Sequence, residues 1–168
     1  AQFEGKAEDN LVVKAFKLLQ DKYALPPVEI HLLKNIPSGA GLGGGSSDAA
    51  FMLKLLNEYF ELALNHEELT SYALKLGSDC PFFIDNKASF VEGRGEHLFQ
   101  IKENTLTGKW VIILFPNIHI STQAAFSGIN NFSSHVEKDY FIDKALSLDN
   151  QIKNDFEKGL FDEYEILR

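Results

Sequence analysis

The sequence predicts an α+β fold, with helices and short strands mixed along one chain. Apolar residues recur every three or four positions in three segments, which predicts helices at residues 9–23, 46–62 and 65–77. Short apolar or alternating runs predict strands at residues 28–32, 82–84, 88–91, 97–101 and 110–115. The second helix is followed by a third helix rather than by a parallel strand. A Rossmann-type βαβ unit is therefore missing.

The composition is typical of a globular protein that is acidic overall. The chain has 168 residues, 45% hydrophobic and 24% charged, a mixture typical of folded domains. Its 16 basic and 24 acidic side chains give a net charge of −8, which argues against binding nucleic acid or anionic lipid. The single cysteine excludes an internal disulfide and fits a reducing compartment. We expect a cytoplasmic protein that binds neither nucleic acid nor membrane, and the oligomeric state stays open.

The helices carry recognisable end signals. Asp9 or Asn10 can cap the first helix, and Asn65 with Glu68 forms a capping box for the third, which Gly77 ends. Ser121 can cap a further short helix, and helical patches follow residue 133.

The strand segments include one expected hairpin and one expected buried strand. Residues 82–84 and 88–91, joined by the turn at Asp85 and Asn86, predict a β-hairpin. Gly93-Arg94-Gly95 then turns the chain again, and Glu92 and Glu96 are expected at a solvated hairpin end. Residues 110–115 form a continuous apolar run, which predicts a strand buried on both faces.

The most unusual segment is a loop with five glycines between Gly39 and Gly45. Glycines cost conformational entropy, and an ordinary turn needs one or two of them. Their use here is close approach of the backbone to a ligand, at the N-terminus of a helix where N–H groups attract phosphate. The candidate phosphate-binding residues are Pro37, Ser38, Gly39, Ala40, Gly41, Leu42, Gly43, Gly44, Gly45, Ser46 and Ser47.

The common phosphate loops do not fit this segment. A Walker A loop requires a Lys where Ser46 follows Gly45, and the Gly-rich loop of protein kinases requires further motifs that are absent. The whole pattern, Pro37-x-Gly-x-Gly-Leu-Gly-Gly-Gly-Ser-Ser-x-Ala-Ala, resembles the second motif of the GHMP kinase superfamily. Further ordered matches are Asp9-Asn10-Leu11, Leu76-Gly77-Ser78-Asp79-Cys80-Pro81-Phe82-Phe83, Glu92-Gly93-Arg94-Gly95-Glu96 and Asn154-Asp155-Phe156-Glu157.

This resemblance implies a GHMP-kinase fold in two parts. Residues 1–115 would form the ATP-binding domain, similar to domain 2 of ribosomal protein S5, and residues 116–168 would begin the C-terminal domain. The family's N-terminal Lys motif and C-terminal glycine motif are not found here. The resemblance therefore implies an internal piece of the kinase. The only methionine is Met52, which fits either excision from a longer protein or removal of an initiator.

The resemblance also implies a reaction, with ATP and Mg²⁺ as cofactors. The γ-phosphate of ATP would pass to an alcohol, and the three-glycine form of the loop points to a cytidylyl sugar alcohol of isoprenoid precursor synthesis as the substrate. Asp79 matches the family's catalytic base, which also contacts substrate. Thr122 and Phe126 fall where substrate is held, with Phe126 stacking on cytosine. Residues alone leave Asp79 open as a turn-forming Asp and Phe126 as a core aromatic.

Several alternatives stay open at this point. The chain could be another GHMP kinase, of the homoserine or mevalonate type, or a nucleotide-binding module without activity. Asp48 could favour the helix N-terminus or help to hold Mg²⁺. No metal ligand is assigned, since the five histidines show no metal-binding spacing. Cys80 is expected to be a small packed side chain.

Overall fold

The computed structural model describes residues 6–36, 39–101, 107–114, 116, 118, 120–129 and 154–167. The chain divides into two compact units, Ala1–Gln100 and Ile101–Arg168. The first unit combines helices with a small antiparallel sheet, which confirms the predicted α+β class. None of the helices in these described segments has the length and apolar character needed to cross a lipid bilayer.

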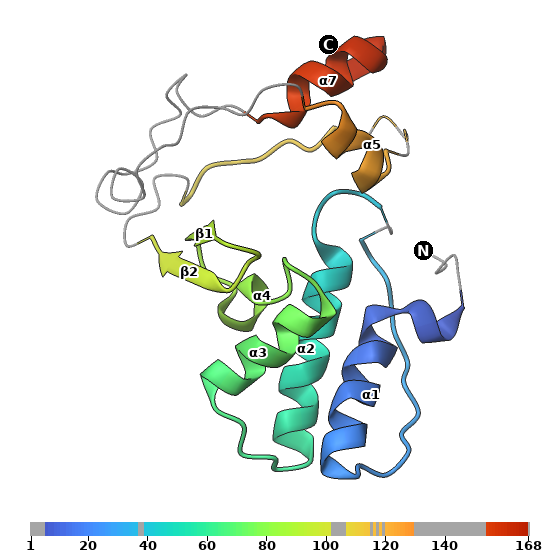
Figure 1. Ribbon diagram of the computed structural model, residues 1–168, viewed down its shortest axis with the longest axis vertical. Coiled ribbons are helices and arrows are strands. Elements are labelled where there is room, and N and C mark those ends of the chain that lie inside the picture. The colour runs from blue at the N-terminus through green and yellow to red at the C-terminus, as the bar shows by residue number, and fades with distance from the viewer. Residues whose placement is uncertain are drawn as a thin grey trace. The chain divides into compact units, whose positions relative to one another are not determined.

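The first unit is built around helix α2, Gly44–Tyr59. It lies between α1, Leu11–Tyr23, and α3, His66–Leu76, and contacts both (Figure 1). All three predicted helices are therefore present, although α2 begins two residues earlier and ends three residues earlier than expected. The core between them includes the buried side chains of Leu19 and Leu53. Burying a leucine contributes roughly 1.5–3 kcal/mol to folding.

The predicted capping residues are also confirmed. Asn10 caps α1 by accepting the Val12 backbone N–H at 2.9 Å, after a short 3₁₀ turn at Ala7–Asp9. At α3 the capping box is complete, because Asn65 accepts the Glu68 backbone N–H and the Glu68 side chain accepts the Asn65 N–H, both at 3.0 Å. Such caps satisfy N–H groups that the helix itself cannot pair.

The predicted hairpin at residues 82–91 is wrong in its first arm. Phe82–Asp85 forms the short helix α4, because Pro81 supplies a helical φ of −56° and the Phe83 N–H already bonds the Cys80 carbonyl. The hairpin instead joins β1, Ser89–Glu92, to β2, His97–Gln100, with Phe90 opposite Phe99. The expected turn at residues 93–95 and the strand near residues 97–101 are thus confirmed.

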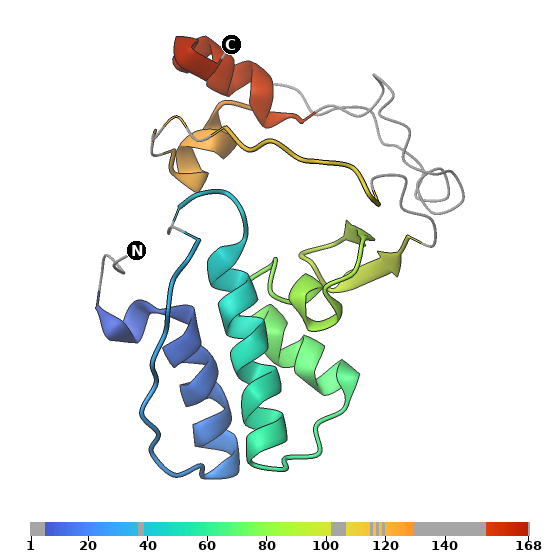
Figure 2. The same cartoon turned by 180° about the vertical axis from the view of Figure 1, so that it is seen from behind.

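The strand predicted at residues 28–32 is not formed. The segment is extended and runs back beside α1 (Figures 1 and 2), but no backbone hydrogen bond joins it to another described residue. It instead lines an apolar groove of about 770 Å³ together with Phe51, Leu55 and Tyr59 of α2. The alternating pattern identified an extended segment with one apolar face correctly. The pattern could not show whether a neighbouring strand is present to pair with this segment.

The second unit contains two packed helices in its described part. Ser121 caps α5, Thr122–Ser127, by accepting the Ala124 N–H at 3.1 Å, as predicted. Helix α7, Phe156–Glu163, contacts α5 and is followed by a 3₁₀ turn at Glu165–Leu167. The segment after residue 133 was expected to hold helical patches, and α7 is one of them; residues 130–153 lie outside the described part.

The buried strand expected at residues 110–115 is wrong for the positions described. Residues 109–114 carry no regular structure, and Trp110 is 98% exposed. Val111, Ile112 and Leu114 are likewise exposed, since no described strand or helix layer covers them. Phe115 lies outside the described residues. An apolar run predicts burial only if the chain also supplies the surface that buries it.

Candidate active site

The glycine loop leads from the extended segment into the first turn of α2. Gly39, Gly41 and Gly43 have φ values of 74°, 70° and 66°, so every second residue lies in the left-handed region. Such alternation turns successive backbone N–H groups toward a common side, which is how anion-binding loops are built. Pro37 and Ser38 lie outside the described residues.

One side of this loop is packed and the other is open. A Cβ atom at Gly43 would lie 2.9 Å from Cζ of Phe83, and one at Gly44 would lie 3.1 Å from Cγ2 of Ile36. At Gly41 a Cβ would meet nothing within 4 Å. Together with the positive end of the α2 dipole, this geometry fits the phosphates of a nucleotide.

An ion pair that was not predicted from the sequence connects the segment before the loop to the helix after it. The Lys34 ammonium donates to Oδ2 of Asp48 at 2.6 Å, and the two side chains are only 9% and 29% exposed. A Cβ at Gly44 would lie 3.8 Å from the same ammonium nitrogen. The pair therefore joins the segment entering the loop to the first turns of α2, and it engages the carboxylate that had been considered for Mg²⁺.

Asp79 stands on a turn that is fixed on one side and open on the other. The turn is closed by the Cys80 N–H bonding the Gly77 carbonyl at 3.1 Å, and it leads through Pro81 into α4. Cys80 and Pro81 are fully buried, whereas Asp79 is exposed. The exposed carboxylate can reach a ligand while its backbone neighbours hold it in place.

The loop and the Asp79 turn meet at the start of α2. Burial raises the pKa of the Cys80 thiol, while a hydrogen bond from the Ser46 hydroxyl acts in the opposite direction and the Asp79 carboxylate adds a smaller upward effect. The Cys80 thiol, which adjoins Asp79, therefore lies near the Ser46 side chain at the end of the phosphate loop. The contact between Gly43 and Phe83 joins the same two segments a second time.

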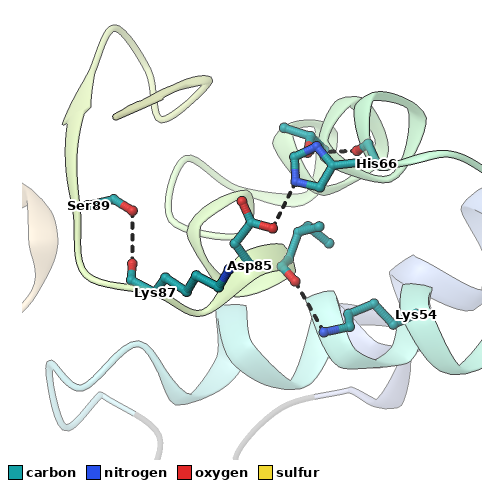
Figure 3. Close-up of polar contacts among 7 residues, drawn as sticks. Lys54, His66, Asp85, Lys87 and Ser89 are labelled. Carbon is teal, nitrogen blue, oxygen red and sulfur yellow. Dashed lines mark hydrogen bonds and ion pairs between the residues drawn. The ribbon is translucent and has the colours of Figure 1, made fainter. Parts of the chain in front are cut away.

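Helix α4, which follows the Asp79 turn, forms polar contacts with both α2 and α3. Lys54 of α2 donates to the Ile84 carbonyl at 3.1 Å, and His66 of α3 pairs with Asp85 at 3.0 Å (Figure 3). Beyond the helix, the Ser89 hydroxyl donates to the Lys87 carbonyl at 2.9 Å. These contacts fix the position of the chain between the Asp79 turn and the hairpin.

Metal-binding groups are sparse in the described segments. No group of three or more His, Cys, Asp or Glu side chains there is arranged to hold a metal ion. The Asp48 carboxylate is engaged with the Lys34 ammonium. The loop thus fits phosphate better than it fits a protein-bound metal ion.

The predicted substrate residues Thr122 and Phe126 belong to the second unit. Thr122 is the first residue of α5. Phe126 is 59% exposed, and its ring packs nearly at right angles to the Phe156 ring, with ring centres 5.1 Å apart. The Phe126 ring is therefore held by α7 on one side, and much of it stays accessible to a ligand.

Comparison with known proteins identifies the class of protein that this chain resembles. Residues 10–87 match the family described as GHMP kinases N terminal domain, and that range contains the loop, the Asp79 turn and all three long helices of the first unit. Over these residues the chain is similar to the GHMP kinase family. Its fold also matches a crystal structure of 4-(cytidine 5'-diphospho)-2C-methyl-D-erythritol kinase with a TM-score of 0.70 and 25% identity, covering 98% of this chain and 61% of that one.

Within the family, the similarity is to one kind of enzyme. Proteins named 4-diphosphocytidyl-2-C-methyl-D-erythritol kinase from Bacteroides fragilis and Bacteroides thetaiotaomicron are each 47% identical to it over 99% of its length. The chain spans 61% of the length of these relatives.

Proposed function

We propose that this chain is the ATP-binding part of a cytoplasmic kinase that acts on 4-diphosphocytidyl-2-C-methyl-D-erythritol. The γ-phosphate of ATP would pass to the 2-hydroxyl group of this compound, in non-mevalonate isoprenoid precursor synthesis. The observation that supports the proposal is the packing of the glycine loop on the segment that follows Asp79, where a Cβ atom at Gly43 would lie 2.9 Å from Cζ of Phe83. One segment suits phosphates and the other presents a carboxylate, which are the two elements that phosphoryl transfer to an alcohol requires.

The loop residues would bind the triphosphate. In this proposal residues 37–47 surround the triphosphate. Pro37 has no N–H and the Ser47 N–H bonds the Gly43 carbonyl, so the N–H groups between them face the phosphate oxygens, and the start of α2 adds its positive dipole. ATP supplies the phosphoryl group when bound, with Mg²⁺ offsetting part of its charge. Lys34 lies close to Gly44 and, paired with Asp48, supports the loop from the side of α2.

Asp79 would act as the general base. Its carboxylate accepts the proton of the substrate hydroxyl, and the oxygen freed of that proton forms a bond to the γ-phosphorus. The bond from that phosphorus to the bridging oxygen breaks, and ADP leaves with the electron pair. Since Asp79 is exposed and the two residues that follow it, Cys80 and Pro81, are buried, it can meet a hydroxyl without losing its orientation.

The second unit would supply substrate contacts. We assign Thr122 and Phe126 to the cytidylyl substrate, with the accessible Phe126 ring stacking on the cytosine base. In this proposal residues 1–115 act as the ATP-binding domain and residues 116–168 begin the substrate-binding domain.

The proposal is tested by Asp79→Asn in a whole-length kinase that carries this sequence. The amide keeps the shape of the carboxylate but cannot take a proton, so kcat should fall by at least roughly 10²-fold. The affinity for ATP, measured by calorimetry, should change little because the loop provides that binding. Asp21→Asn, on an exposed position of α1, is the matched control and should leave both values unchanged.

The outcomes separate the candidate functions. Turnover of the cytidylyl substrate that Asp79→Asn abolishes supports the proposal, whereas near-normal turnover by this variant refutes the role of Asp79. Turnover of homoserine or mevalonate in its place would identify another GHMP kinase. ATP binding without turnover of any of these alcohols would identify a nucleotide-binding module.

A further inference from the structure

The tip of the β1–β2 hairpin contains a residue that is buried where a solvated turn is expected. In the stretch 85–100 every residue is exposed or partly exposed except Gly95, although it lies in the turn between the strands. The sequence predicts a solvated hairpin end at Glu92 and Glu96. Something in the first unit therefore covers one side of the tip.

The covering group is the backbone of Ser78, the residue before Asp79. A Cβ atom at Gly95 would overlap the Ser78 carbonyl oxygen, and it would lie 2.8 Å from the carbonyl carbon and 3.3 Å from Cα of the same residue. The contact is backbone against backbone, so no side-chain rotation can relieve it. With φ of 119°, Gly95 also has a conformation that residues with a side chain rarely adopt.

The tip itself is held in shape by short-range hydrogen bonds. The Glu96 carboxylate accepts the Arg94 backbone N–H at 2.6 Å, and the Gly95 N–H bonds the Glu92 carbonyl at 3.4 Å. The tip is thus a preformed turn that rests on the Asp79 segment. Cys80 and Pro81 hold that segment from the core side.

We propose that Gly95 is a positioning residue: the hairpin tip presses on the Ser78 carbonyl and so fixes the Asp79 carboxylate relative to the glycine loop. The inference rests on the proposed function only for the role of Asp79. The contact itself can be tested without any catalytic assay. A displacement on the order of 1 Å at a reacting group can cost roughly 10²-fold in rate.

Cys80 provides a direct readout of the position of this turn. It is the only cysteine of the chain, it is fully buried, and it follows Asp79. Gly95→Ala should push Ser78 away and expose the thiol, so that labelling by a thiol-reactive disulfide reagent becomes at least about tenfold faster. In the whole-length kinase, kcat should fall by a similar factor while KM for ATP stays within about threefold.

Gly93→Ala is the matched control. Gly93 has φ of 72°, so alanine is strained there as well, but its Cβ would meet only the end of the Glu96 side chain, at 2.9 Å. This variant should therefore lose stability, but beyond that loss its labelling should be accelerated no more than in Glu96→Gln, and its kcat should fall much less than that of Gly95→Ala. Urea unfolding of each variant gives its free energy of unfolding. From this value we calculate the rate at which Cys80 would be labelled if it reacted only in the globally unfolded protein.

Two results would overturn the inference. One is labelling of Gly95→Ala no faster than its global stability accounts for; the other is faster labelling with unchanged kcat. If Gly95→Ala does not fold, Glu96→Gln is the variant that tests the inference. It weakens the hydrogen bond that holds the hairpin tip and adds no atoms at the contact with Ser78. It should accelerate labelling about twofold to fivefold, and an unchanged rate would refute the role of the tip. Should Asp79→Asn remain active, the base assignment fails while the labelling results still test the contact.

Discussion

The loop glycines are predicted to differ in the sign of their effect on stability. Gly43 has φ of 66° and would place a Cβ atom 2.9 Å from the Phe83 ring. Gly45 lies inside the first turn of α2, and its Cβ would sit 3.8 Å from Leu11, an ordinary contact. We therefore compare Gly43→Ala with Gly45→Ala.

The magnitudes follow from these two environments. At Gly43 the left-handed backbone costs an alanine about 1–2 kcal/mol, and displacing the Phe83 ring adds about 1–3 kcal/mol. At Gly45 alanine should stabilise the helix by about 0.5–1 kcal/mol. The two variants should therefore differ by at least about 2.5 kcal/mol in unfolding free energy. For a unit near 100 residues this corresponds to a difference in Tm on the order of 10 °C or more.

Urea unfolding followed by circular dichroism measures both values, and calorimetry with ATP follows the same samples. Since Gly43→Ala disturbs the packed side of the loop, it should also weaken ATP binding at temperatures where the fold is intact. A destabilised Gly45→Ala, or a Gly43→Ala variant as stable as the parent, would refute the crowded environment assigned to Gly43 and the uncrowded one assigned to Gly45.

Two further predictions concern the ends of local structure. Asn65→Ala removes the cap of α3 and should lower the unfolding free energy by about 1 kcal/mol in urea titrations, while Asn65→Asp should retain most of it. Hydrogen bonds from the backbone N–H groups of Glu96 itself and Arg94 lower the pKa of the Glu96 carboxyl. Its contribution to stability is therefore present above the ordinary glutamate pKa and is lost as the pH falls through the depressed value. Glu96→Gln should flatten the acid limb of the stability profile, and an unchanged limb would contradict this account.

The helical half of the first unit could be predicted because its signals are local. The spacing of Val12, Ala15 and Leu19, and the capping box at Asn65 and Glu68, act within one or two turns of the chain. Hydrogen bonds between neighbouring residues decide such features, so a single sequence contains the information.

The strand predictions depended on partners that a pattern does not reveal. Residues 28–32 have the alternation of a strand and are extended, yet among the described residues they have no neighbour to pair with. At residues 82–84 three apolar residues suit a strand equally well, but Pro81 and the contacts of Lys54 and Asp85 select a helix. A short apolar run is ambiguous until its surroundings are known.

The candidate site was predictable in its chemistry and not in its assembly. The glycine pattern identified the loop, and the motif around Asp79 identified the turn. The supporting contacts were missed because they join residues far apart in the sequence. Lys34 pairs with Asp48 across 14 positions, and Gly95 packs on Ser78 across 17. The only available signal was that Gly93 and Gly95 enclose a turn with more glycine than a hairpin needs.

These contacts explain why three separate glycine-containing segments are found in one small unit. Residues 39–45 require glycine to expose N–H groups, Gly77 ends the helix before the Asp79 turn, and Gly95 lets a second backbone approach that turn. Two rigid segments can keep a fixed distance only if each is held from more than one side. The loop is held by Phe83 and Ile36, and the turn by the core at Cys80 and by the hairpin tip at Gly95. Loosening either support should therefore change the distance between the phosphates and the base before it unfolds the protein, and reaction rate should be lost before stability.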